Sequence, residues 1–361
     1  MKHVLGESNT AKIYTDLVDT TTLEQVRELV DQTFTKDSKI RIMPDCHAGK
    51  GCVVGTTMTL ADKVVPNLVG VDIGCGVLAT KLDTKEISFE KLDEIIHNYI
   101  PAGFKIHENN IADFDELDSF LCPIVKDRAK CSIGTLGGGN HFIELNKDEN
   151  GDYWLVIHCG SRHLGIEVAD YYQREAERLC KEHVPKDLTY VEGDVFEDYI
   201  HDMNLAQKFA ALNRETIANV IVRELGVNKV DSFDTIHNYI DTKNMVLRKG
   251  AISAQLGEKV IIPMNMRDGS LICVGKGNED WNCSAPHGAG RILSRTEAKN
   301  SLNLEDFKST MDGIYTTSVN NSTIDEAPMA YKPVEKILEN IGDTVDVVET
   351  IKPVYNFKAH K

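Results

Sequence analysis

Residues 69–77, with the sequence VGVDIGCGV, constrain the fold most strongly, because they place a carboxylate and a thiol inside a glycine-rich segment. Apolar residues alternate there with polar or glycine positions, which predicts a short strand that ends in a glycine turn. Asp72 and Cys75 would then lie together at the strand end, where both could reach one divalent cation. The alternative is a buried strand with an unreactive cysteine, since free cysteines are among the most buried residue types.

Two histidines, His141 and His158, lie beside glycine turns farther along the chain, as Cys75 does, and a third, His237, is isolated. His141 lies between a run of three glycines and a predicted strand at 142–145, His158 follows a predicted strand at 153–157, and His237 follows a short apolar segment. Glycine turns at strand ends are common places for metal and phosphate sites. The recurrence of this arrangement therefore favours one shared site.

Two further glycine-rich segments each carry a histidine. The segment at 44–55 is not a phosphate-binding P-loop, because the Lys-Ser/Thr ending is absent. Its His47 could be a ligand, a base or a structural residue, and we place it outside the ligand set. His287, in CSAPHGAGR, is predicted at the N-terminus of a helix, where free N–H groups bind anions, with Arg291 close behind it.

The chain shows no internal repeat, low-complexity segment or linker, which predicts a single domain over residues 1–361. With 42% hydrophobic residues it can bury a large core. The net charge of −16 argues against a protein that wraps nucleic acid through bulk positive charge, but not against a local basic groove. Helices are expected at 21–33, 87–100, 111–127, 166–180 and 204–225, and strands at 13–15, 40–43 and twice within 250–262.

The sequence also bears on the cellular compartment. The N-terminus lacks an apolar core of signal-peptide length, and no run approaches the roughly 18 apolar residues of a membrane span. The nine cysteines are odd in number and lack the spacing of a disulfide framework. We therefore expect a cytoplasmic protein without a membrane partner.

Several motifs, in a fixed order, resemble the RtcB family of GTP- and manganese-dependent RNA ligases. They are VGVDIGCG, GGGNHFIE, IHCGSRHLG, the pair His237-Asn238, HGAGR and a lysine near the end of the chain. The resemblance extends from MPDCHAGKG at Met43 to YNFKA ending at Ala359. It implies an α+β fold, a single large domain with branched mixed β-sheets surrounded by helices, and a centre of two Mn²⁺ ions.

The resemblance also implies roles for individual residues. The metal ligands would be Asp72, Cys75, His141, His158 and His237, a set that also suits Fe²⁺ or Zn²⁺, so the choice of manganese comes from the resemblance. His287 would become guanylylated, and a histidine with a pKa of about 6.5 is largely neutral at about pH 7.5, as a nucleophile must be. The residues expected to hold GTP are Asn140, Glu144, Asn238, Pro263, Met264, Asn265, Met266, Ser270, Gly288, Ala289, Gly290, Arg291, Tyr331 and Lys358, with Tyr331 against the guanine base.

One segment departs from the family pattern. Many members carry Pro-Gly-Ser-Met against the nucleotide, and this chain has Pro263-Met264-Asn265-Met266 in that place. Asn265 could still form a hydrogen bond where a serine would. The chain is also compact for the family, and the role of such members in RNA repair or in tRNA splicing stays open.

The activity expected from the resemblance is the GTP-dependent joining of RNA 3′-phosphate or 2′,3′-cyclic phosphate ends to 5′-hydroxyl ends. The motifs identify no activating protein partner. Two alternatives are a metal-dependent 2′,3′-cyclic phosphodiesterase that does not ligate and a catalytically silent RNA-binding protein. His287 and Lys358 favour the ligase over the phosphodiesterase, which would need neither of them, and the filled ligand positions argue against a silent protein.

Overall fold

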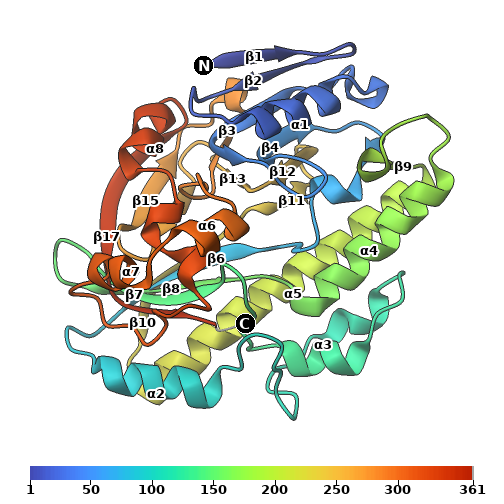
Figure 1. Ribbon diagram of the computed structural model, residues 1–361. Helices are drawn as coiled ribbons and strands as arrows, with labels where there is room; N and C mark the ends of the chain where they lie inside the picture. Colours follow the sequence, from blue (N-terminus) through green and yellow to red (C-terminus); the bar gives the residue numbers. More distant parts are fainter. Residues whose placement is uncertain (360–361) are drawn as a thin grey trace.

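Two β-sheets lie at the centre of the structure, and helices surround them (Figure 1). The computed structural model describes residues 1–359. The six-stranded sheet has the order β1 (Lys2–Leu5), β2 (Thr10–Ile13), β3 (Ile40–His47), β4 (Val54–Thr59), β12 (Val246–Lys249) and β11 (Asn238–Asp241). The seven-stranded sheet has the order β10 (Lys229–Ile236), β6 (Gly76–Leu82), β8 (Tyr153–Cys159), β7 (Phe142–Lys147), β17 (Val345–Lys358), β15 (Gly269–Gly275) and β14 (Lys259–Asn265).

The two sheets differ in strand direction. In the six-stranded sheet β2 and β3 run parallel while the other pairs are antiparallel. The seven-stranded sheet is antiparallel throughout. Its longest strand, β17, pairs with β15 through its first half and with β7 through its second half. The last residue of β17, Lys358, is thereby placed opposite Phe142 at the start of β7.

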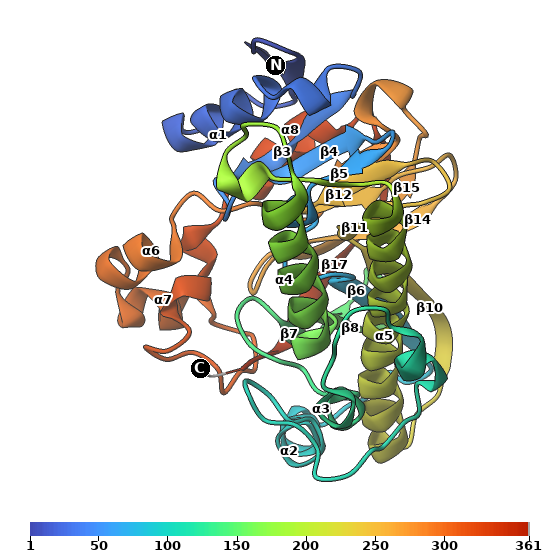
Figure 2. The same cartoon turned by 90° about the vertical axis from the view of Figure 1, so that its right-hand side faces the viewer.

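Two long helices, α4 (Arg162–Leu179) and α5 (Asp194–Leu225), run side by side across the sheets (Figure 2). The residue after α5 is Gly226, which has a left-handed backbone with φ of 74°. A residue with a side chain would disfavour this conformation, so a glycine suits the end of the helix. The other helices are α1 (Thr20–Val30), α2 (Phe89–Tyr99), α3 (Lys126–Ser132), α6 (Arg295–Ser301), α7 (Leu304–Thr310) and α8 (Val334–Ile341).

Two main groups of buried apolar side chains hold these layers together. The first packs the six-stranded sheet against α1, α4 and α5, and includes Ile42, Val26 and Tyr172. The second packs the seven-stranded sheet against α2 and α5, and includes Leu155 and Ile221. Burial of this apolar surface is the main driving force for the fold. The small pairs β5 (Lys63–Val64) with β9 (Val191–Glu192), and β13 (Ala251–Ser253) with β16 (Ser284–Pro286), complete the strands.

The α+β class is confirmed, and so are most of the predicted elements. The helices expected at 21–33, 87–100, 166–180 and 204–225 correspond to α1, α2, α4 and α5. The strands expected at 142–145 and 153–157 correspond to β7 and β8, and those within 250–262 to β13 and β14. Within residues 1–359 no helix is both long enough and apolar enough to cross a lipid bilayer.

Three predicted elements are wrong, and each error has a local cause. Residues 69–75 form an irregular turn instead of a strand, because Gly70 and Gly74 adopt φ of 93° and 72°. The helix expected at 111–127 is interrupted at Pro123, which cannot continue a helix, and gives the 3₁₀ turn η3 (Asp115–Ser119) and α3.

The third error concerns the segment after His287. No helix begins there, because α6 starts only at Arg295, where Ser294 and Glu297 form a capping box. Ile292 and Leu293, the apolar residues on which that helix was predicted, lie outside it. His287 follows β16 and leads into an irregular segment.

Candidate metal and nucleotide site

The turn at 69–75 delivers its side chains to one end of the seven-stranded sheet. Gly76, the first residue of β6, pairs with the end of β10 on one side and the end of β8 on the other. His237 and His158 therefore lie on either side of Cys75. The His237 N–H also donates to the carbonyl oxygen of Cys75 at 2.9 Å, which ties the chain after β10 to the turn.

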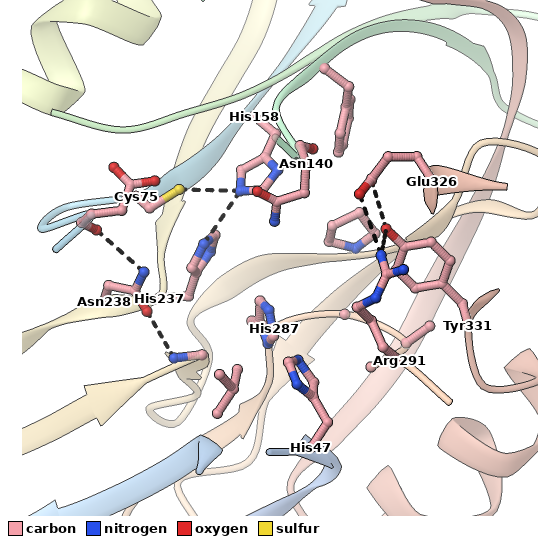
Figure 3. A pocket seen from close by; sticks show the side chains of 18 of the residues that line it. His47, Cys75, Asn140, His158, His237, Asn238, His287, Arg291, Glu326 and Tyr331 are labelled. Carbon is pink, nitrogen blue, oxygen red and sulfur yellow. Dashed lines mark hydrogen bonds and ion pairs between the residues drawn. The ribbon is translucent and has the colours of Figure 1, made fainter. Parts of the chain in front are cut away.

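The five predicted ligand side chains meet at this place. The Cys75 Sγ lies 3.2 Å from His158 Nε2 and 3.5 Å from His141 Nε2. His141 Nε2 is also 3.0 Å from Asp72 Oδ2. The Nε2 atoms of His158 and His237 are 3.3 Å apart (Figure 3). Ligand atoms of Cys75, His141 and His158 all lie within 4.8 Å of one another. A buried thiol with imidazoles around it could hold a metal ion.

The tautomers of two of these histidines suit metal binding. His141 Nδ1 is 2.8 Å from the carbonyl oxygen of Leu136, and His158 Nδ1 is 3.2 Å from that of Asn140. Because a carbonyl oxygen only accepts, each Nδ1 carries the proton in this arrangement. The Nε2 of His158 then points its lone pair into the cluster, as in histidines that ligate metals. The Nε2 of His141 instead donates to Asp72 Oδ2, because the nearby thiols and this carboxylate outweigh burial and raise the pKa of His141 well above its ordinary value. A metal ion would replace the proton on this nitrogen.

The burial of the cluster shifts its pKa values in directions that matter for ligation. Burial lowers the pKa of His158 and of His237 well below the ordinary value, and neighbouring histidines lower it further, so both imidazoles are neutral. Desolvation would raise the pKa of Asp72, but the hydrogen bond from His141 outweighs it and the pKa falls to about 2. Burial and the Asp72 carboxylate raise the pKa of Cys75 to about 12. An ion bound here would displace the thiol proton.

A glycine is required next to this cluster. A Cβ atom on Gly160 would lie 1.9 Å from Asp72 Oδ1, and that oxygen could not stay in place. The glycine in HCGSR therefore serves the close approach of Asp72 to β8.

A first cavity of about 370 Å³ opens beside the cluster. Cys75, His158 and His237 line one part of it, and His287 lies next to them with its ring centroid 4.9 Å from that of His237 (Figure 3). A cavity of this size, with apolar walls and a few convergent polar groups, is typical of small-molecule sites.

Asp45, at the end of β3, fixes the segment that carries His287. Its Oδ2 accepts hydrogen bonds from the N–H groups of His287 and Gly288 at 3.1 and 3.2 Å. The same oxygen lies 2.7 Å from His287 Nδ1, a contact at ion-pair distance but outside the angles of a hydrogen bond. Gly290, with φ of 71°, allows this approach, since a Cβ there would lie 2.0 Å from the Asp45 carbonyl oxygen. Asp45 therefore lies beside Nδ1 of the His287 ring and not beside Nε2.

Most of the residues expected to hold a nucleotide line the first cavity. Ser270 does not, because it is fully buried within β15, and His141 lines a different cavity described below. His47 also lines the first cavity, although we placed it outside the ligand set. Those of the expected nucleotide residues that line it are Asn140, Glu144, Asn238, Pro263, Met264, Asn265, Met266, Gly288, Ala289, Gly290, Arg291, Tyr331 and Lys358.

A buried carboxylate, Glu326, organises the wall that lies across the cavity from the ligand cluster. Lys358 Nζ is 2.8 Å and the Tyr331 hydroxyl 2.7 Å from its Oε2, while Arg295 donates to Oε1 at 2.7 Å and Arg291 at 3.3 Å. Burial alone would raise the pKa of Glu326, but Lys358 and Arg295 outweigh it and lower the pKa to about 2. The carboxylate is therefore ionised and balances the surrounding cations.

A second cavity, of about 670 Å³, lies on another side of the ligand cluster and shares Val71 and Asp72 with the first. Arg128 of α3 and Arg162 of α4 line it, together with His141. Arg162 has the unusual φ of 59°, and its guanidinium donates to the Gly103 carbonyl and the Thr135 hydroxyl at 2.9 Å each. Strained backbone of this kind is concentrated at functional sites. The other lining residues are Gly103, Phe104, Ile106, Ser132, Gly138, Gly139, His163 and Ile166.

Sequence reasoning missed three of the residues that shape the first cavity. Asp45 and Glu326 were not predicted because a carboxylate next to a proline or an alanine carries no local signal of burial. Arg295 was missed because the helix was expected to begin eight residues earlier. The Asp-Cys-His run at 45–47 and the acidic pair at 325–326, so close to Tyr331, were the available hints.

Comparison with known proteins identifies the family. A family model described as tRNA-splicing ligase RtcB matches residues 25–123 and 119–359. The chain belongs to the RtcB family. The RNA-splicing ligase RtcB of Escherichia coli K12 is 32% identical over 362 residues, which cover 87% of this chain and 88% of that protein. The tRNA-splicing ligases RtcB of Nanoarchaeum equitans and Aeropyrum pernix are each 28% identical over 82% of this chain and 83% of theirs.

The RtcB match covers all parts of the site. The first matched segment contains Asp72 and Cys75, and the second contains the three histidines of the cluster, His287 and Lys358. The resemblance found in the motifs is thus confirmed. The donor set fits a divalent transition metal, because it combines a thiol, a carboxylate and three imidazoles. The wall around Glu326 fits a phosphorylated ligand, because three cations line it.

Proposed function

We propose that this protein, an RNA ligase of the RtcB family, joins RNA 3′-phosphate or 2′,3′-cyclic phosphate ends to 5′-hydroxyl ends with consumption of GTP. The observation that carries the proposal is the position of His287. It lies in the first cavity between the Cys75 cluster and the cationic wall around Glu326. A nucleoside triphosphate in this cavity would place its phosphates beside the imidazole.

In this proposal the cluster holds the metal. Asp72, Cys75, His141, His158 and His237 would bind two Mn²⁺ ions, which neutralise phosphate charge and polarise phosphorus–oxygen bonds. Cys75 and the histidines orient these ions, and the carbonyl acceptors of His141 and His158 keep the ring nitrogens aimed inward.

His287 would act as the nucleophile. Asp45 holds its backbone and lies beside Nδ1, so Nε2 is free to attack the α-phosphorus of GTP. A nitrogen–phosphorus bond forms as the bond to the bridging oxygen of the β-phosphate breaks, and pyrophosphate leaves. The product is a protein phosphoramidate that carries GMP.

Two transfers complete the proposed reaction. An oxygen of the RNA 3′-phosphate attacks the phosphorus on His287, the nitrogen–phosphorus bond breaks, and the RNA ends in 3′-phosphate-GMP. The 5′-hydroxyl of the second RNA then attacks the RNA 3′-phosphorus, loses its proton to solvent and displaces GMP. A 2′,3′-cyclic phosphate is first opened by water to a 3′-phosphate.

The second cavity is the proposed entry of the 5′-hydroxyl strand. It reaches Asp72 and His141 from a side that the nucleotide would not occupy, and its arginines suit an RNA backbone. A ligase must hold two RNA ends and a nucleotide at one centre, and two cavities that share Asp72 allow this. We further propose a cytoplasmic role in RNA repair or tRNA splicing.

Covalent labelling tests the proposal. Incubation with GTP labelled on its α-phosphate and with Mn²⁺ should leave the label on the protein, in a bond that is labile to acid and stable to base. His287→Ala should remove the label, because no other group is placed to accept the nucleotide. His201→Ala is the matched control, since His201 is half-exposed and lines neither cavity.

The same variant separates ligation from simple hydrolysis. His287→Ala should fail to join RNA with a 3′-phosphate, yet should join RNA that already ends in 3′-phosphate-GMP. Retained labelling of His287→Ala, or opening of cyclic phosphates by wild-type protein without any labelling, would overturn the proposal in favour of a phosphodiesterase.

A further inference from the structure

The cationic wall of the first cavity depends on Glu326, for which the proposed function has no role so far. Glu326 belongs to the 3₁₀ turn η6 (Ile324–Glu326), and 2% of its side chain is exposed. Its two oxygens serve different partners: Oε2 receives Lys358 and Tyr331, and Oε1 receives Arg295 and Arg291. The two partners on Oε2 come from distant parts of the fold, the end of β17 and the segment after η7 (Pro328–Ala330).

Lys358 lies near two buried acids but pairs with one. It forms its ion pair with Glu326, and within residues 1–359 it forms none with Glu144, although its positive charge lowers the pKa of Glu144 against the larger effect of burial. The nearest partners of Glu144 are amides: Asn356 donates to it at 2.6 Å and Asn146 at 3.4 Å. Glu144 therefore keeps acceptor capacity toward the cavity that it lines.

A guanine base would fit a carboxylate and an ammonium that lie close together without forming an ion pair, as Glu144 and Lys358 do. Its Watson–Crick edge carries two kinds of N–H donor beside one carbonyl oxygen, so it needs a carboxylate and a cation side by side but not bound to each other. If Lys358 were released from Glu326, its buried ammonium could turn to Glu144, which lies on the neighbouring strand two residues from the position opposite Lys358. That new pair would remove both the acceptor and the donor from the base.

We propose that Glu326 is a positioning residue for the guanine nucleotide: it holds Lys358 and Tyr331 in place and keeps Lys358 from pairing with Glu144. The inference rests on the proposed function, because it concerns the nucleotide expected in the first cavity. Glu326 acts through its neighbours and does not touch the reacting phosphorus.

The test is equilibrium dialysis with GMP and AMP, which share the phosphate but differ in the base and cannot react with His287. Wild-type protein should prefer GMP. Glu326→Gln should weaken GMP binding by about 10-fold to 100-fold and AMP binding much less, so that the ratio of the two affinities falls. In guanylylation assays the KM for GTP should rise far more than kcat falls.

Asp325→Asn is the matched control. Asp325 is the preceding residue and equally buried, and it pairs with Arg295 and Lys299, but it contacts neither Lys358 nor Tyr331. This variant should keep the wild-type ratio of GMP to AMP affinity. A general loss of fold in Glu326→Gln would appear as a lower Tm, and Glu326→Asp, which keeps the charge, then replaces it in the assay.

A double-mutant cycle tests whether Glu326 acts through Lys358. Glu326→Gln should weaken GMP binding by less in the Lys358→Met background than in wild type, because the part that acts through Lys358 is already lost and only the part through Tyr331 remains. Equal GMP affinity in Glu326→Gln and wild type would overturn the inference and leave the proposed function standing. Wild-type protein that binds no GMP would instead count against the proposed function itself.

Discussion

The two cavities that share Asp72 differ in whether their arginines are paired with a carboxylate. In the first, Lys358, Arg291 and Arg295 are tied to a buried carboxylate. In the second, Arg128 and Arg162 have no carboxylate within ion-pair distance among residues 1–359. Cations paired with a carboxylate are held in fixed positions and suit one small ligand, whereas arginines without a carboxylate partner keep their full charge for a polyanion whose sequence varies.

The walls of the two cavities also differ in how firmly their residues are held. In the first cavity, glycine turns and strand ends fix the polar groups at distances near 3 Å. The second is bordered by the loop with Phe104, whose ring is 91% exposed, and by α3 and α4. An exposed phenylalanine beside arginines that have no carboxylate partner is the combination on which single-stranded nucleic acids stack. The difference indicates that specificity is built into the first cavity and adaptability into the second.

The largest effect is expected from a substitution in the ligand cluster, which both cavities border. Cys75→Ala should lower metal content, guanylylation and ligation by more than about 100-fold, because the thiol lies at the centre of the ligand group. Metal analysis of the purified variant, together with labelling and ligation assays, measures this. Cys52→Ala removes an equally buried thiol outside both cavities, so it should keep its metal. Normal metal content in Cys75→Ala would show that this cysteine is only a core residue.

The next effect should be confined to the first cavity. Asp45→Asn should slow guanylylation by about 10-fold to 100-fold, because the carboxylate that fixes His287 and Gly288 loses its charge. Metal content should not change, and neither should the joining of RNA that already carries 3′-phosphate-GMP. If that last reaction fell equally, Asp45 would serve the whole site instead of His287.

A smaller effect should separate the second cavity from the first. Arg128→Ala should raise the KM for 5′-hydroxyl RNA about threefold to tenfold and leave guanylylation without RNA unchanged. The dependence of RNA affinity on salt should also weaken, by about 0.7 in the log–log slope for one lost phosphate contact. Lys130→Ala, on the same helix but outside the cavity, is the control. Equal effects of the two substitutions would mean that charge near α3, and not the cavity, attracts RNA.

The smallest effect concerns stability and the buried acid of the first cavity. Burial raises the pKa of Glu144 from 4.5 to about 7, so between these values the folded protein keeps a proton that the unfolded chain loses. Its contribution therefore favours folding at low pH and is lost as the pH rises through 7. The Tm of wild type should fall by a few degrees relative to Glu144→Gln between pH 5 and pH 8. A constant difference between the two Tm curves would contradict the raised pKa.

The sequence predicted the helices, the strands and the identity of the site residues better than it predicted how these residues are arranged in space. Long amphipathic patterns such as that of α5 were read correctly, because their period repeats over many turns. The turn at 69–75 was mistaken for a strand, since alternation over a few residues does not reveal that two glycines adopt positive φ. The five predicted ligands meet in space. The recurring glycine turns favoured a shared site, and the resemblance supplied the full set of five.

The partners of the predicted residues could not be read from the sequence. Asp45 and Glu326 act on His287 and Lys358 from 242 and 32 positions away in the chain. Such contacts are set by strand order and register, which single-sequence patterns do not determine. The second cavity was missed for the same reason, because its residues come from a loop, two helices and two turns.

The position of β17 has a consequence for how the molecule is made. This strand joins β15 to β7 within the seven-stranded sheet and carries Lys358 to the first cavity. During synthesis the rest of the sheet emerges from the ribosome while its centre still lacks a strand. The nascent chain therefore exposes open strand edges until β17 has been made, and the first cavity is completed only when Lys358 has emerged.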